Sequence, residues 1–109
     1  MPRGGSDQAQ RFYADVVGLE PIERPGSLGG AGVWFRAGSQ ELHVSEEDEF
    51  IPAARAHPAF ALAGRELDAL AARIEATGAQ VQWDERLPGA RRFYSLDPAG
   101  NRLEFLTRE

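Results

Sequence analysis

The chain has no cysteine among its 109 residues. This absence excludes disulfide bridges, thiolate metal ligands and a thiol nucleophile. Positive charge is also scarce, since 12 Lys and Arg residues stand against 17 Asp and Glu residues and leave a net charge of −5. Nucleic acids and anionic membrane surfaces are bound by basic faces, so we expect neither as a partner.

Long apolar runs are missing as well. No segment approaches the roughly 18 apolar residues of a membrane-spanning helix. Residues 1–6 (MPRGGS) lack the apolar core of a secretory signal, and we therefore expect a cytoplasmic protein. Hydrophobic residues make up 42% and charged residues 27% of the chain. These values are near the globular average, and the length suits a single domain spanning residues 1–109.

The first half of the chain has the pattern of one helix followed by three strands. Within residues 8–17 apolar side chains recur four apart, which predicts an amphipathic helix. Ser6 or Asp7 is expected to cap this helix, and Gly18 to end it. Residues 45–56 are acidic and then turn-like, and we interpret them as a linker. Short strands are expected at residues 19–23, 33–37 and 40–44.

The second half repeats this order with one more strand in front. A helix is predicted at residues 65–77, and strands at residues 57–63, 81–83, 91–96 and 102–106. The repeat indicates an α+β fold of paired βαβββ modules, at about residues 6–45 and 57–107. The first strand of module one is missing, because the six residues before its helix are too few and too polar to form it.

Successive residues of a strand point to opposite faces, so each predicted strand has an apolar face and a second face. His43, His57 and Glu104 fall on the second faces, and they meet if every apolar face packs on the two helices. Two imidazoles and a carboxylate suit a divalent ion such as Fe, Mn, Ni, Co or Zn. Two alternatives stay open. The polar face can be merely solvated, and Glu41 competes with His43 because it lies on the same side.

Three segments resemble the vicinal oxygen chelate superfamily, which contains glyoxalase I, bleomycin-resistance proteins, fosfomycin-resistance enzymes and extradiol dioxygenases. Residues 11–19 (RFYADVVGL) resemble its first-helix signature FY-x-D-x-LGL. Residues 97–105 (DPAGNRLEF) resemble its closing signature DP-x-GN-x-[IL]-E-[FL]. Residues 56–60 (AHPAF) fall where the second module of the family usually opens with a histidine. The resemblance extends over nearly the whole chain.

This resemblance implies a mixed sheet curled into a cup, with the helices on the outside. It also implies that His57 and Glu104 are metal ligands and that His43, or else Glu41, is a third ligand. Glu104 is then the catalytic residue, because it holds the ion at the reacting centre. The ligand that the family's first strand commonly supplies, a histidine, has no counterpart in this chain.

Further side chains on the cup side are expected to line a substrate pocket. Trp34 and Arg36 alternate with apolar neighbours, and one of the adjacent pair Arg91 and Arg92 faces the same way. The arginines are either anion partners or surface charge. Aromatic side chains on the later strands, Tyr94 and Trp83, either line the pocket or simply pack. The predicted pocket comprises Trp34, Arg36, Glu41, Arg92 and Tyr94.

The sequence supports three functional hypotheses. A metal-dependent enzyme of lyase, isomerase or dioxygenase type would bind two adjacent oxygens of a small substrate and stabilise the charge that develops there. The alternative is a metal-free module that sequesters a drug or another small molecule, and the third is a degenerate module that keeps only an interaction surface. The sheet edge left unpaired by the missing strand predicts a homodimer.

Overall fold

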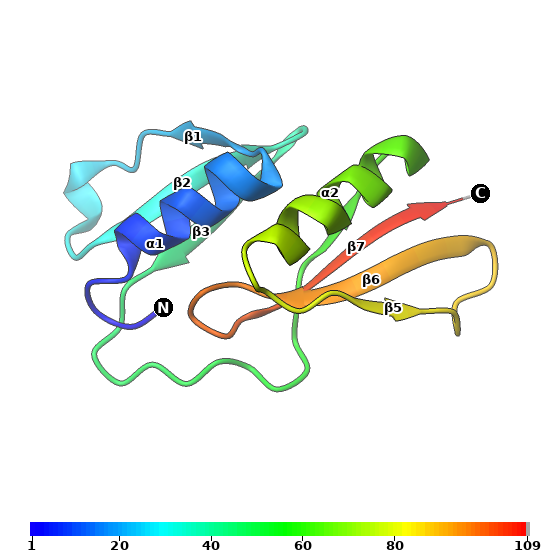
Figure 1. Cartoon of the computed structure of the whole chain (residues 1–109). Helices are drawn as coiled ribbons and strands as arrows, with labels where there is room; N and C mark the ends of the chain where they lie inside the picture. Colours follow the sequence, from blue (N-terminus) through cyan, green and yellow to red (C-terminus); the bar gives the residue numbers. More distant parts are fainter. Residues whose placement is uncertain (109) are drawn as a thin grey trace. The chain divides into compact units, whose positions relative to one another are not determined.

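The computed structural model describes residues 1–108, which form two compact units, Met1–Pro52 and the residues from Ala53 onward. In each unit a helix lies against one face of a β-sheet (Figure 1). The expected α+β class is therefore confirmed. Among the described residues, none of the helices has the length and hydropathy needed to traverse a lipid bilayer.

The first unit has the order helix–strand–strand–strand. Its helix begins as α1 and continues without a break into the wider turns of η1, which end at Gly18 in a left-handed conformation with φ 94°. The three strands are antiparallel and stand in the order β1–β2–β3. The elements are α1 (Ser6–Gln10), η1 (Arg11–Val17), β1 (Glu20–Ile22), a short 3-10 turn η2 (Gly26–Leu28), β2 (Gly32–Ala37) and β3 (Gln40–Ser45).

Within the described residues no strand precedes α1, but Met1 and Pro2 lie where such a strand would pair. The Met1 amino group donates to the Ser45 carbonyl at 3.0 Å, and the Glu47 N–H donates to the Met1 carbonyl at 2.8 Å. Pro2 and Glu47 form a parallel bridge just beyond β3. Met1 and Pro2 therefore lie beside the end of β3, as an opening strand would.

The predicted side-chain cap of the first helix is wrong. Gly5 occupies the N-cap position, and no side chain bonds to the first-turn amides. Ser6 instead donates its hydroxyl to Glu46 at 2.5 Å, and the Gly4 N–H donates to the other Glu46 oxygen at 2.8 Å. The acidic segment after β3 thus holds the residues that lead into α1.

The second unit is a complete βαβββ module with a mixed sheet. Its strands stand in the order β4–β7–β6–β5, where β4 runs parallel to β7 and the other neighbours are antiparallel. The helix begins and ends within one residue of the predicted range. The elements are β4 (Ala59–Ala61), α2 (Gly64–Ala76), β5 (Gln82–Asp84), β6 (Ala90–Leu96) and β7 (Arg102–Arg108).

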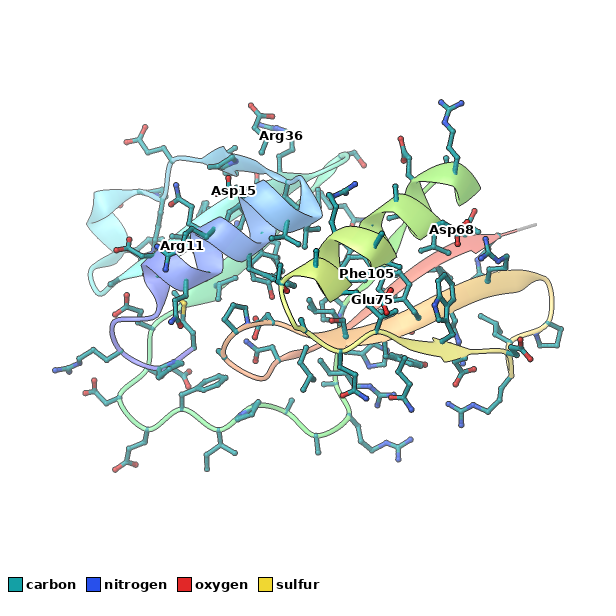
Figure 2. All side chains as sticks on the ribbon, viewed as in Figure 1. Arg11, Asp15, Arg36, Asp68, Glu75 and Phe105 are labelled. Atoms are coloured by element: carbon teal, nitrogen blue, oxygen red, sulfur yellow. The ribbon has the colours of Figure 1, made fainter. Side chains whose placement is uncertain are left out.

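Strand alternation separates a helix-facing side of each sheet from a second side. Phe93 and Phe105 are opposite each other on β6 and β7, have ring centroids 5.3 Å apart and are completely buried. Figure 2 shows Phe105 under α2, whose buried stripe includes Leu67, Leu70 and Ile74. Burying such side chains supplies most of the driving force for folding. Glu104 is adjacent to Phe105 in sequence, so its side chain lies on the opposite side of β7, away from this core.

The turn between β6 and β7 fixes which residues stand opposite each other. The Asp97 carboxylate accepts hydrogen bonds from the backbone N–H groups of Ala99 and Asn101, both at 2.9 Å, and from the Asn101 amide at 2.8 Å. Such Asx-type bonds stabilise a tight turn locally. The resulting register places Glu104 directly opposite Tyr94.

Candidate functional site

One face of the second sheet, opposite α2, gathers most of the predicted site residues of this unit. Glu104 is central, because β7 lies between β4 and β6. Ala59 is paired with Glu104 across the parallel β4–β7 ladder, and the Pro58 carbonyl accepts the Glu104 N–H at 3.0 Å. The predicted strand at residues 57–63 is shorter than expected, and His57 stands just before it. We call this face the site face; it comprises His57, Ala59, Ala61, Arg92, Tyr94, Arg102 and Glu104.

His57 and Glu104, which the sequence analysis expected on one face of the sheet, are in direct contact. His57 Nε2 lies 2.9 Å from Glu104 Oε1, and His57 Nδ1 lies 2.7 Å from the Arg55 carbonyl oxygen. A carbonyl oxygen can only accept, so Nδ1 carries a hydrogen. In a neutral imidazole Nε2 then presents its lone pair to a carboxylate oxygen. Two acceptor atoms at 2.9 Å need either a proton or a metal ion between them.

Arg92 holds the other oxygen of Glu104. One terminal nitrogen of Arg92 donates to Glu104 Oε2 at 3.2 Å, and the other donates to Asp84 Oδ1 at 3.3 Å. Burial alone would lower the pKa of Arg92, but the hydrogen bonds and the nearby negative groups raise it above its ordinary value. Arg92 therefore stays charged while its side chain is only 16% exposed.

Asp84 connects this network to the edge strand β5. The Arg86 side chain and the Arg86 backbone N–H both donate to Asp84, and they hold the pKa of its carboxyl group at about 2 instead of 3.8, with a smaller effect from Arg92. Asp84 is therefore ionised at neutral pH. It neutralises part of the positive charge that Arg92 brings to the site face.

Tyr94 forms an aromatic wall beside Glu104. The guanidinium of Arg102 lies 4.2 Å from its ring centroid, that of Arg92 lies 5.2 Å away, and His57 meets the ring edge-on at 5.6 Å. Cation–π contacts of this kind hold a guanidinium over a ring face. Tyr94 itself is only 9% exposed.

Trp83 is not part of this wall. Of the two expectations for Trp83, that it lines the pocket or that it simply packs, the first is corrected. It pairs with Phe93 on the helix-facing side of the sheet, and its ring tilts against Phe93 at 5.1 Å. Arg91 lies over Trp83 and bonds to Asp68 of α2 at 2.8 Å. Of the adjacent arginines, Arg92 is the one on the site face.

The first unit brings together the remaining predicted residues on the second face of its own sheet. His43 stacks on Trp34 with ring centroids 3.5 Å apart and an interplanar angle of 6°. His43 Nε2 lies 2.8 Å from Glu41 Oε1, so the two competing ligand candidates contact each other. Arg36 pairs with Glu20 at 3.5 Å. Participation of His43 in a common site with His57 and Glu104 stays a prediction, because it belongs to the other unit.

Three residues of the network, Asp84, Arg86 and Arg102, were not assigned a role from the sequence. Arg102 lies two residues before Glu104 on the same strand, so strand alternation places both side chains on one face. This alternation was a sufficient signal to find Arg102. Asp84 lies just beyond the strand predicted at residues 81–83. Its partnership with Arg92 depends on how far β5 extends, and no motif indicates that length.

The donor atoms of His57 and Glu104 fit two ligands of a divalent ion. Two ligand atoms about 2.1 Å from one ion and at a right angle are about 3 Å apart, close to the 2.9 Å observed. The Nδ1–H of His57 is anchored on a carbonyl and the free oxygen of Glu104 on Arg92, as outer partners of metal ligands usually are. Residues 1–108 contain no cluster of three or more His, Asp or Glu side chains able to hold an ion.

Comparison with known proteins gives consistent results. A family model described as a glyoxalase-like domain matches residues 4–106. A putative glyoxalase family protein from Bacillus anthracis is 38% identical to this chain, with a TM-score of 0.91 over 100% of this chain and 88% of that one. A lactoylglutathione lyase from Agrobacterium tumefaciens is 30% identical, with a TM-score of 0.70 over 93% and 84% of the two chains.

A fosfomycin resistance protein from Listeria monocytogenes, solved in complex with Mn(II), has the same fold. It is 20% identical, with a TM-score of 0.78 over 95% of this chain and 84% of that one. A search of curated proteins found no match to this chain. The resemblance to the vicinal oxygen chelate superfamily, inferred from three segments of the sequence, is confirmed.

Proposed function

Since the chain belongs to the glyoxalase-like domain family of the vicinal oxygen chelate superfamily, we propose that it is a divalent-metal-dependent enzyme. Its substrate is a small molecule that offers two adjacent oxygen atoms to the ion. The observation that carries this proposal is the contact of His57 Nε2 with Glu104 Oε1 at 2.9 Å, in which the other nitrogen of His57 already donates to a carbonyl.

His57 and Glu104 are the proposed ligands in the second unit, and His43 is the proposed third ligand. Imidazole nitrogen and carboxylate oxygen suit Fe, Mn, Ni, Co or Zn. The relative from Listeria monocytogenes was solved with Mn(II), which makes Mn(II) the first ion to test.

The residues of the site face each have a definite part in this proposal. A bound ion supplies Lewis-acid stabilisation of negative charge that develops on substrate oxygens. Arg92 fixes the orientation of Glu104 by holding its second oxygen, and the Arg55 carbonyl fixes the ring of His57. Ala59 and Ala61 are exposed and small, so they leave room for a ligand beside His57. Glu104 acts as the catalytic residue, because it contacts the ion at the reacting centre.

A second candidate function is metal-free binding of a small molecule or drug. It is favoured by one specific observation: a proton on His57 Nε2 satisfies the contact with Glu104 as well as an ion does. In that case the contact of His57 with Glu104 is an ion pair, and a small ligand would lie beside it on the exposed Ala59 and Ala61.

Metal binding to purified protein separates the two candidates. Isothermal titration with Mn(II) is expected to show saturable binding to the wild type. His57→Ala and Glu104→Gln should each weaken that binding at least about tenfold, since loss of even an outer partner of a ligand costs about 10–100-fold. Glu66→Gln on α2 is the matched control and should leave binding unchanged. Absence of binding to the wild type would favour the metal-free candidate.

A further inference from the structure

We infer that the ligand of this site carries an anionic group and that Arg102 binds it. This inference rests on the proposed function, whose ion lies between His57 and Glu104, and it names a chemical class for the substrate. The class is a small molecule with a carboxylate or phosphoryl group in addition to its chelating oxygens.

Arg102 pairs with no anionic side chain among residues 1–108. It is only partly exposed, and its guanidinium rests over the Tyr94 ring at 4.2 Å. Among the residues that the structure describes, no hydrogen bond or ion pair engages this guanidinium. Arg92 and Arg86, by contrast, both donate to carboxylates. The donors of Arg102 therefore remain available in the planar arrangement that matches the two oxygens of a carboxylate or phosphoryl group.

The local charge of the site face points the same way. Three guanidinium groups, those of Arg86, Arg92 and Arg102, stand against the two carboxylates of Asp84 and Glu104. Among these five charged side chains one positive charge is therefore in excess, although the whole chain has a net charge of −5. A local positive potential on an acidic protein concentrates small anions at that place.

Arg102 is also at the right place for a ligand held by His57 and Glu104. Tyr94 stands directly opposite Glu104, and Leu96 directly opposite Arg102, so Arg102 is one diagonal step from Tyr94. The same tyrosine ring forms a T-shaped contact with His57 and has the Arg102 guanidinium over it. Arg102 thus flanks the same tyrosine ring that His57 contacts, on the face that carries Glu104.

Anion titration of the purified protein tests this inference. Inorganic phosphate and malonate are added separately at constant ionic strength, and the arginine Nε–Hε and tyrosine ring signals are followed by NMR. We expect saturable shifts of the Arg102 and Tyr94 signals in the wild type. Arg102→Gln should weaken binding at least about tenfold, the scale of a charge-assisted bidentate pair, whereas Arg102→Lys should retain part of it. The relative affinity for the two anions identifies the preferred group.

Arg108→Gln is the matched control, because Arg108 is an exposed arginine on the same face of the same strand. It should bind both anions as the wild type does. Absence of saturable shifts in the wild type, or equal binding by Arg102→Gln, would overturn the inference. Mn(II) titration of the same samples keeps the two claims separate. Retained Mn(II) binding without anion binding refutes the role of Arg102 alone, and anion binding without Mn(II) binding refutes the proposed metal dependence alone.

Discussion

Glu104 combines burial with two close neighbours, the His57 imidazole and the Arg92 guanidinium. Its side chain is 8% exposed, one oxygen faces His57, and the other accepts from Arg92. A buried carboxylate keeps its charge only where partners compensate for the lost water. Replacement by glutamine keeps the volume and removes the charge, so it changes the electrostatics of the site with little change of its shape.

Asp84 makes the stability of the second unit dependent on acid pH. Its pKa is held at about 2 instead of 3.8 because Arg86 donates from its side chain and its backbone. The stabilisation that follows is fully present above about pH 3.8 and is lost as the pH falls from there through about 2. Asp84→Asn should therefore be less stable than the wild type at neutral pH, and the difference should shrink within this window.

Urea unfolding of the wild type and Asp84→Asn between pH 2 and 6 measures this effect. Glu85→Gln, next to it on the chain, serves as a charge-matched control. A difference in the free energy of unfolding that stays constant over the whole range would contradict the assigned role of Asp84.

At the scale of elements, the β6–β7 hairpin is what brings Glu104 to the site face. Asp97 closes the turn through two backbone N–H groups and the Asn101 side chain. Gly100 in this turn has φ 91°, a conformation that other residues rarely adopt. The turn sets the register, and the register places Glu104 opposite Tyr94.

Asp97→Ala should destabilise the protein by about 1–3 kcal/mol, the cost of leaving partly buried donors without an acceptor. Asp97→Asn keeps one acceptor oxygen and should lose less. Chemical denaturation gives both values, and Mn(II) titration shows whether the site is affected. Stability of Asp97→Ala equal to that of the wild type would show that the turn forms without these bonds.

The elements were largely predictable from the sequence because each has a clear periodicity. The stripe Leu67, Leu70, Ala71 and Ile74 of α2 is buried as expected. Alternation alone placed His57 and Glu104 on one face. The charged network was not predictable in the same way. The contacts of Arg92 and Arg102 depend on side-chain rotamers. The expected side-chain cap is absent because Gly5 takes the N-cap position, while the Ser6 hydroxyl donates to Glu46.

At the scale of the whole molecule, each unit holds one imidazole–carboxylate contact. His43 contacts Glu41 in the first unit, and His57 contacts Glu104 in the second. His43 belongs to the first unit and the other two proposed ligands to the second. A test of His43 as the third ligand is therefore a test of the complete chain and not of one unit.

The stack of His43 on Trp34 offers a direct optical probe of this ligand. The chain has two tryptophans, so Trp83→Phe leaves Trp34 as the single emitter. Zn(II) is expected to change the Trp34 fluorescence in Trp83→Phe, because coordination by His43 alters the stacked ring. The change should disappear when His43→Ala is added. Zn(II) binding without any change in emission would exclude His43 as a ligand.

We also predict that the protein is a homodimer. Within its own unit β3 pairs with β2 on one side, while only Met1 and Pro2 lie beside its other edge near the end. Exposed strand edges are usually covered in natural proteins. Sedimentation at micromolar concentration should give the mass of a dimer, and the mass of a single chain would contradict this prediction.

The cation between His57 and Glu104 can be identified by ¹⁵N NMR of the histidine side chains, since the chain has only two histidines. Without metal and near neutral pH, the spectrum reports whether Nε2 of His57 carries a proton. On addition of Zn(II) we expect Nδ1 to keep its proton and Nε2 to move to the position of a metal-bound nitrogen. A His57 ring that stays protonated on both nitrogens at saturating Zn(II) would contradict the proposed metal centre.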